Sequence, residues 1–133
     1  MHVQKLVYIA HGWCLALLNR PLVYESVQAW QWGPVIPRLY EELKKYGAGE
    51  VTESLPVEFS GPVEPLSQEM GIIRAVWKAY GKFSAMQLSA ITHKAGTPWQ
   101  QVWSTTTYGY IPDELIREHY LHLKNERTGR PNT

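Results

Sequence analysis

Two pairs of metal-ligating side chains occur at helical spacing. His11 and Cys14 are three residues apart, and so are His119 and His122. Thiolate and imidazole groups at this spacing could bind zinc from one face of a helix. Neither a Cys-x-x-Cys nor a His-Glu-x-x-His motif accompanies them. We therefore interpret all four as ordinary core or helix-surface residues, and expect the chain to bind no metal ion.

Nucleophilic catalysis would need an activated serine or cysteine beside a general base. Cys14 lies on the apolar face of its helix, which predicts a buried and inert thiol. The sequence contains neither a G-x-S-x-G motif nor a phosphate-binding P-loop. The adjacent carboxylates of Glu41 and Glu42 fall on a solvated helix face. We expect no catalytic residues and no cofactor, with a small hydrolase as the weakest alternative.

Aromatic residues gather at two places, and they form the most unusual feature of the sequence. Trp30, Trp32 and Tyr40 surround the segment 33–35, and a second group follows at residues 99–110. Tryptophan and tyrosine are favoured at interface hot spots, because they bury a large area with little loss of entropy. Packing in the core is the competing interpretation for each of them. Six tryptophans are difficult to bury completely in so small a domain, so we expect one or two to reach a groove.

The candidate partner-binding residues are Trp30, Trp32, Pro34, Arg38 and Tyr40. Alternation along a strand predicts that both tryptophans lie on the same face. If that face is a groove, the two indoles form an anchor for a partner. If it packs into the core, Arg38 and Tyr40 become the exposed candidates. A third interpretation is that these residues only lock a hairpin onto the following helix.

The composition is that of one small domain in a reducing compartment. The 133 residues carry a net charge of +1, which gives no bulk attraction to nucleic acid or to an anionic membrane. A single cysteine cannot form an internal disulfide. The apolar stretches are too short to span a bilayer, and the N-terminus lacks the pattern of a secretory signal. We predict a cytoplasmic protein.

The N-terminal third predicts two helices that flank a short strand pair. Apolar residues recur every three or four positions through residues 1–18, as on one broad face of a helix. Alternation on both sides of Glu25 and Ser26 predicts an antiparallel pair that Gly33 and Pro34 close. A second helix should run over residues 36–46 and stop at Gly47.

The C-terminal half predicts further helices after a proline-containing acidic segment at residues 48–66. Ser67 should cap one helix, Ser84 with Gln87 should form a capping box, and Thr97 should precede a third helix. The last helix should open at residues 111–114. Residues 1–123 then form one mainly α domain with a small β element, and residues 124–133 form a loose polar tail. The expected core includes Trp13, Leu17, Leu39, Leu43, Trp77 and Leu88.

Several of these segments resemble the Panacea domain of SocA-like antitoxins and GepA-like phage-associated proteins. They are residues 4–13 (QKLVYIAHGW), 21–22, 29–37 (AWQWGPVIP), Tyr40, 44–47 (KKYG), 88–99 (LSAITHKAGTPW) and 111–112. The likeness covers nearly the whole chain. It implies an antitoxin that neutralises a cognate protein toxin by direct binding. The family also includes an adaptor that delivers its toxin to a protease, a special mechanism that we do not transfer to this chain.

Family members often carry a further helix before the Gln-Lys-Leu motif, and this sequence has none. Part of the core or partner surface would then be missing, or be replaced by self-association into a homo-oligomer. The alternative function is a DNA-binding regulator of a toxin–antitoxin operon, because charge outside the acidic region 50–69 is positive. A recognition helix needs Arg, Asn or Gln clustered on one exposed face. The sequence shows no such cluster, which disfavours a nucleic-acid partner.

Overall fold

The computed structural model describes residues 2–43 and 67–127. Within these residues the chain forms, in order, α1 (His2–Leu18), β1 (Gln28–Trp30), β2 (Gly33–Val35), α2 (Pro37–Leu43), α3 (Gln68–Tyr80), α4 (Ala85–His93), α5 (Pro98–Trp103) and α6 (Asp113–Arg127). The predicted mainly α fold, with a small antiparallel element between the first two helices, is confirmed. None of the helices in these ranges is long and apolar enough to cross a membrane.

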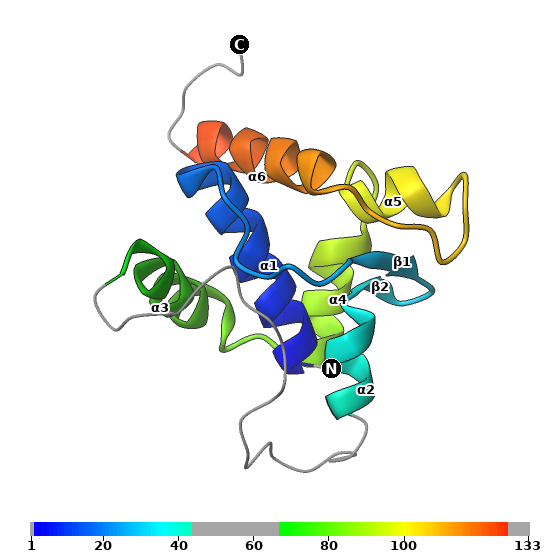
Figure 1. The fold of residues 1–133 in the computed structure, drawn as a ribbon, viewed down its shortest axis with the longest axis horizontal. Coiled ribbons are helices and arrows are strands. Elements are labelled where there is room, and N and C mark those ends of the chain that lie inside the picture. The colour runs from blue at the N-terminus through cyan, green and yellow to red at the C-terminus, as the bar shows by residue number, and fades with distance from the viewer. Residues whose placement is uncertain (1, 44–66, 128–133) are drawn as a thin grey trace.

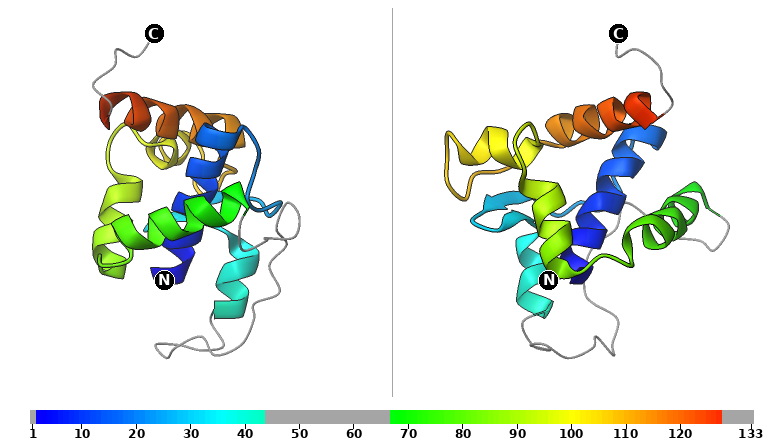
Figure 2. Two further views of the ribbon diagram at one scale, coloured as in Figure 1. Left: turned by 90° about the vertical axis from the view of Figure 1, so that its left-hand side faces the viewer. Right: turned by 180° about the vertical axis from the view of Figure 1, so that it is seen from behind.

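Helix α1 is the centre of the structure. It contacts α6, α3, α4 and β2. Figures 1 and 2 show α6 crossing one end of α1. Helix α3 lies on one side of α1, and α4 and the hairpin lie on its other side. Most of its side chains are therefore buried, including the polar Gln4, Lys5 and His11. A helix that is covered on most of its faces has a broad apolar surface, as the spacing of its apolar residues predicted.

The contact between α1 and α6 depends on Gly12. A Cβ atom at this position would lie 2.3 Å from Cε2 of Tyr120. The Tyr120 ring instead lies over the bare backbone of α1, with its centroid 5.1 Å from that of Trp13 and 6.4 Å from that of Tyr8. Glycine thus permits the closest approach of these two helices.

The position predicted for the strand pair is wrong. The strands are residues 28–30 and 33–35, with Ala29 opposite Pro34, and residues 31–32 form the turn. The opposite edge of β1 is occupied by a distant segment, because the Ala29 amide donates to the Gly109 carbonyl at 2.8 Å and the Ile111 amide donates to the Val27 carbonyl at 2.8 Å. The two edges of β1 are thus occupied by β2 and by residues 109–111, and alternation in the sequence could not reveal the second pairing.

The predicted helix caps are confirmed. The Ser67 side chain accepts a hydrogen bond from the Met70 amide, and Ser84 forms the complete capping box with Gln87. Thr97 caps α5 ahead of Pro98. The last helix runs to Arg127, so residues 124–127 are helical where a loose tail was predicted. Three predicted parts lie outside the described residues: the end of the second helix, the acidic segment 48–66, and residues 128–133 of the tail.

The core predictions divide into two groups. Trp13, Leu39 and Leu88 are buried as predicted. Leu17 and Trp77 are 47% and 63% exposed, so their assignment to the core is wrong. Helix α3 is buried chiefly through Val76 and Tyr80. Trp77 follows Val76 by one position, which is about 100° around the helix axis, so its side chain points away from that contact. The Leu43 side chain lies outside the described part of the chain.

Candidate partner-binding groove

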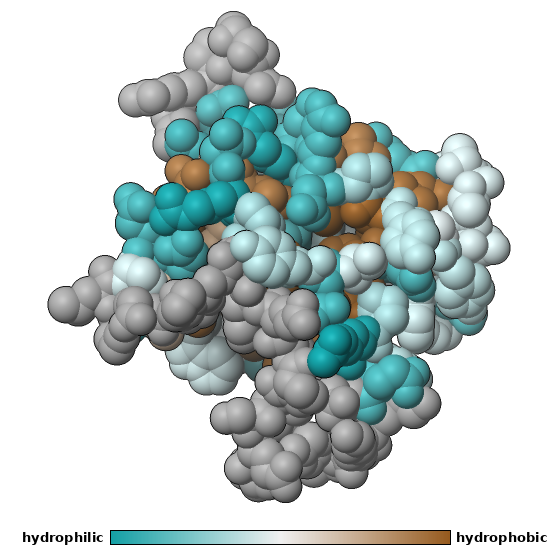
Figure 3. All heavy atoms as spheres, viewed as in Figure 1, coloured by the Kyte–Doolittle hydropathy of each residue, from teal (hydrophilic) through white to brown (hydrophobic). Residues whose placement is uncertain are grey.

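A groove of about 730 Å³ lies between the hairpin, α2, α4 and the loop before α6. We call it the aromatic groove. It is lined by Lys5, Trp30, Gln31, Trp32, Val35, Tyr40, Ala85, Met86, Ser89, Ala90, His93 and Tyr108. Figure 3 shows hydrophilic residues over α6 at the top, and residues of intermediate hydropathy towards the side of the hairpin and the loop after α5.

Trp30 forms a fixed wall of the aromatic groove. Its ring meets that of Tyr40 edge to face at a centroid distance of 4.9 Å, and that of Tyr108 at 6.0 Å. Its indole nitrogen donates to Gln28 Oε1 at 2.9 Å. Its carbonyl oxygen accepts a hydrogen bond from the Trp99 indole. Both the backbone and the side chain of Trp30 are therefore held in place before any partner binds.

Trp32 differs from Trp30 in its exposure. It lies in the turn between β1 and β2, and its side chain is 70% exposed. Its carbonyl oxygen accepts a hydrogen bond from the Ser89 hydroxyl of α4. The backbone at this position is thus fastened to α4 while the indole remains open to solvent. An exposed indole on a fixed backbone loses little entropy when a partner covers it.

The other predicted candidates occupy different positions. Tyr40 lines the aromatic groove and is partly buried. Pro34 is buried, and its carbonyl accepts a hydrogen bond from Lys5. Arg38 is exposed and lies outside the groove, with Nε 3.9 Å from Glu25 Oε1. Three of the five candidates thus line the same groove, and Pro34 and Arg38 are not among its lining residues.

The first turn of α1 holds the hairpin in position, a role that the sequence analysis did not assign. The Gln4 side chain forms two hydrogen bonds with the Ile36 backbone, donating to its carbonyl at 3.2 Å and accepting from its amide at 2.8 Å. Lys5 Nζ donates to the Pro34 carbonyl at 2.7 Å. The available signal was a pair of adjacent polar residues on a mainly apolar helix. Their amide and ammonium groups satisfy backbone groups that burial would otherwise leave unpaired.

Helix α4 supplies the opposite side of the aromatic groove, and it was also missed as part of the site. Met86, Ser89 and His93 share one face of the helix, and Met86 is 83% exposed. An exposed methionine offers a flexible and polarisable contact surface. The sequence signal was Met86 in the first turn of the helix, between the two residues of the capping box.

The Ser89–His93 pair does not have the arrangement of a nucleophile and its base. Ser89 Oγ lies 3.2 Å from His93 Nδ1, but the hydroxyl donates to the Trp32 carbonyl. His93 Nδ1 is also in contact with the Ser89 carbonyl, which can only accept a hydrogen bond. The hydroxyl proton of Ser89 is thus directed at the Trp32 carbonyl and not at the imidazole.

The histidine and cysteine considered as metal ligands have other roles. His11 is fully buried, and its Nδ1 accepts hydrogen bonds from the Leu22 and Val23 amides at 3.2 and 3.3 Å. Its Nε2 then carries the proton and donates to Asp113 Oδ1 at 2.9 Å. Cys14 is fully buried, and burial raises the pKa of its thiol to about 12. No cluster of three or more potential ligands occurs among residues 2–43 and 67–127.

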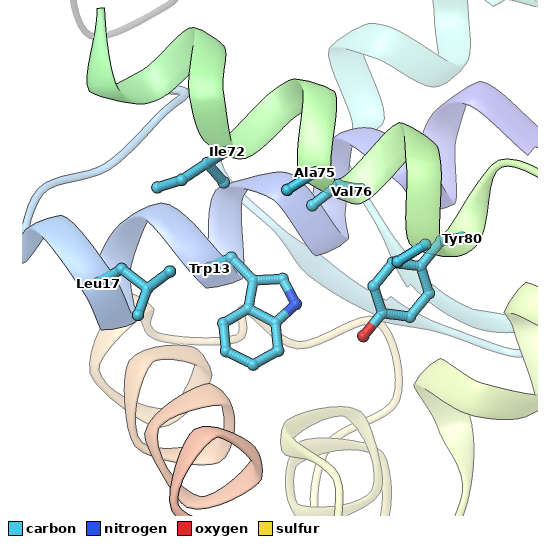
Figure 4. Close-up of a pocket in the computed structure, with 7 residues that line it drawn as sticks. Trp13, Leu17, Ile72, Ala75, Val76 and Tyr80 are labelled. Carbon is cyan, nitrogen blue, oxygen red and sulfur yellow. The ribbon is translucent and has the colours of Figure 1, made fainter. Parts of the chain in front are cut away.

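Two smaller apolar grooves flank α3. The first, of about 230 Å³, is lined by Trp13, Leu17, Ile72, Ala75, Val76, Ala79 and Tyr80. Figure 4 shows the Trp13 and Leu17 side chains of α1 below Ile72 and Val76 of α3. The second, of about 280 Å³, includes the exposed Trp77. These grooves explain why two residues expected in the core are partly open to solvent.

Comparison with known proteins gives two matches. A family model described as antitoxin SocA-like, Panacea domain, matches residues 3–100. The antitoxin SocA of Caulobacter vibrioides (strain NA1000 / CB15N) is 35% identical over 136 residues, which cover 92% of this chain and 71% of that protein. No solved structure matches the chain. The family match contains every residue that lines the aromatic groove except Tyr108.

Proposed function

The chain belongs to the SocA-like Panacea domain family of antitoxins, and from this premise we propose that it neutralises a cognate protein toxin by binding it directly in the aromatic groove. Neutralisation would result from occupancy of the toxin surface and would need no catalysis. Both proteins would act in the cytoplasm. The supporting observation is the exposed Trp32 indole, on a backbone that is fastened to α4.

The aromatic groove has the composition of an interface centre. Such centres are enriched in tryptophan, tyrosine and methionine, and depleted in acidic residues. The groove contains Trp30, Trp32, Tyr40, Tyr108 and Met86, and none of the described Asp or Glu residues lines it. The hydrogen bonds of the Trp30 and Trp32 backbones reduce the entropy that binding must remove.

A neutralisation experiment tests this proposal with a matched control. The product of the neighbouring gene is expressed as the toxin, together with wild-type chain, Trp32→Ala or Trp77→Ala. Both tryptophans are strongly exposed, so neither variant should unfold, which circular dichroism checks. We expect Trp32→Ala to lose growth rescue, whereas Trp77→Ala, which alters α3, should retain it.

Toxin abundance separates direct binding from delivery to a protease. With wild-type chain, we expect growth rescue while the toxin level on an immunoblot stays unchanged. A falling toxin level that accompanies rescue would favour an adaptor role. Full rescue by folded Trp32→Ala would remove the aromatic groove from the interface.

A further inference from the structure

Lys5 is a buried cation that has one hydrogen-bond acceptor within the described part of the chain. The residue is 2% exposed, and its ammonium group donates to the Pro34 carbonyl at 2.7 Å. An ammonium group has three N–H donors. Among the described residues, no carboxylate forms an ion pair with it. Buried charges in proteins are normally paired, because desolvation is costly.

Lys5 is one of the residues that line the aromatic groove, and its side chain extends from α1 to the backbone of the hairpin. The backbone of Gly33 runs past it, so that a Cβ atom there would lie 3.0 Å from Nζ. The other lining residues are mainly aromatic and apolar. Lys5 therefore adds a cation to a groove that is otherwise suited chiefly to apolar side chains.

Among the described residues, no negatively charged side chain lines the aromatic groove to compensate the cation. The titratable side chains that share its lining are Tyr40 of α2, His93 of α4 and Tyr108 of the loop before α6. Neither tyrosine nor histidine supplies a negative charge near neutral pH. Burial lowers the pKa of Lys5 to about 8, so the ammonium form still predominates at pH 7.

We propose that Lys5 binds a carboxylate of the partner segment that occupies the aromatic groove. The carboxylate comes from the end of the partner chain or from an Asp or Glu side chain. An adjacent apolar side chain of the partner packs against Trp32 and Met86. This inference rests on the proposed function, since it names the chemistry of the segment that the groove receives.

Short peptides provide the probes for this site. Acetyl-Leu-Leu with a free carboxylate is compared with its C-terminal amide, and acetyl-Leu-Glu-amide with acetyl-Leu-Gln-amide. Dissociation constants are measured from the indole N–H resonances of Trp30 and Trp32 during titration. We expect the acid of at least one pair to bind about tenfold or more tightly than its neutral partner, as for a charge-assisted hydrogen bond. The pair that shows the preference identifies the source of the carboxylate.

Two lysine variants establish whether Lys5 causes the preference. Lys5→Met removes the charge and keeps the length of the side chain, whereas Lys82→Met removes an exposed lysine outside the groove. The ratio of acid to amide affinity should fall to about one in Lys5→Met and remain unchanged in Lys82→Met. If Lys5→Met does not fold, the Lys5 Cε resonance of the wild-type chain should shift with the acid and not with the amide.

Three results would overturn the inference. They are equal affinities for acid and amide, the same acid preference in a folded Lys5→Met variant, and no binding of any probe up to about 1 mM.

Failure of the proposed function is distinguishable from these three results. If Trp32→Ala abolishes neutralisation while acid and amide bind equally, direct binding stands and the carboxylate site fails. If acids bind through Lys5 while Trp32→Ala neutralises normally, the site stands and its role in neutralisation fails.

Discussion

The replacement of Gly12 by alanine tests the packing of α1 against α6. Alanine in the middle of a helix is favoured over glycine by about 1 kcal/mol. Against this, the new methyl group would lie 2.3 Å and 2.4 Å from two ring carbons of Tyr120. That ring is 3% exposed and contacts the Trp13 and Tyr8 rings, so it cannot move alone. Overpacking of this kind costs up to about 3 kcal/mol. We expect a net destabilisation of about 2 kcal/mol.

The control for this variant is the same substitution in α3. Gly71 has no atom within 4 Å of its missing Cβ, so Gly71→Ala should stabilise the domain by about 0.5–1 kcal/mol. For a domain of 133 residues, the loss at Gly12 corresponds to a fall in Tm of about 7 °C. Thermal and urea unfolding followed by circular dichroism measure both changes. If Gly12→Ala were as stable as Gly71→Ala, the close approach of α1 and α6 would be wrong.

Three further predictions test which side chains are buried. Burial lowers the pKa of Lys5 from 10.5 to about 8, so between these pH values the unfolded chain binds more protons than the folded chain. The free energy of unfolding of the wild type, measured relative to that of Lys5→Met, should therefore rise by roughly 3 kcal/mol from pH 8 to 10.5. No such relative rise in urea titrations would contradict the burial of this ammonium group. The Cys14 thiol, whose pKa is raised to about 12, should not react with a thiol reagent at pH 8 until denaturant is added. Leu88→Ala should cost about 2–5 kcal/mol and Leu17→Ala less than about 1 kcal/mol, and equal denaturation midpoints for the two would show that their burial is misassigned.

The helices could be predicted because their signals are local. Ser84 and Gln87 satisfy each other's backbone amides within one turn, so four residues of sequence contain the whole interaction. The Thr97 cap followed by Pro98 is equally local. The fold class followed from these signals, together with the apolar spacing of α1.

The hairpin and the exposure of α3 depend on contacts between distant residues. Gly109 and Ile111 occupy the outer edge of β1, some eighty positions away in sequence. The side of α3 that faces α1 is set by the angle between the helices, and the apolar stripe alone assigned Trp77 to the core wrongly. Local periodicity contains neither kind of information.

The candidate groove was predicted in part. Trp30, Trp32 and Tyr40 were selected by residue type, and the structure places all three in its lining. Lys5 and Met86 were not selected, because they come from α1 and α4, which only the tertiary fold brings to the hairpin. Arg38 was included as an exposed candidate in case the tryptophans pack into the core, and Pro34 because it restricts the backbone between strand and helix; neither lines the groove. Whether any of them contacts a toxin stays a prediction.

The central claim is direct toxin binding in the aromatic groove, and calorimetry with two purified proteins tests it most directly. The product of the neighbouring gene is titrated with wild-type chain, Trp32→Ala and Trp77→Ala. We predict a complex with wild type, affinity within about twofold of it for Trp77→Ala, and about 30-fold weaker binding for Trp32→Ala, as for a hot spot worth about 2 kcal/mol. An absence of binding by the wild-type chain, or an unchanged affinity of folded Trp32→Ala, would contradict the claim.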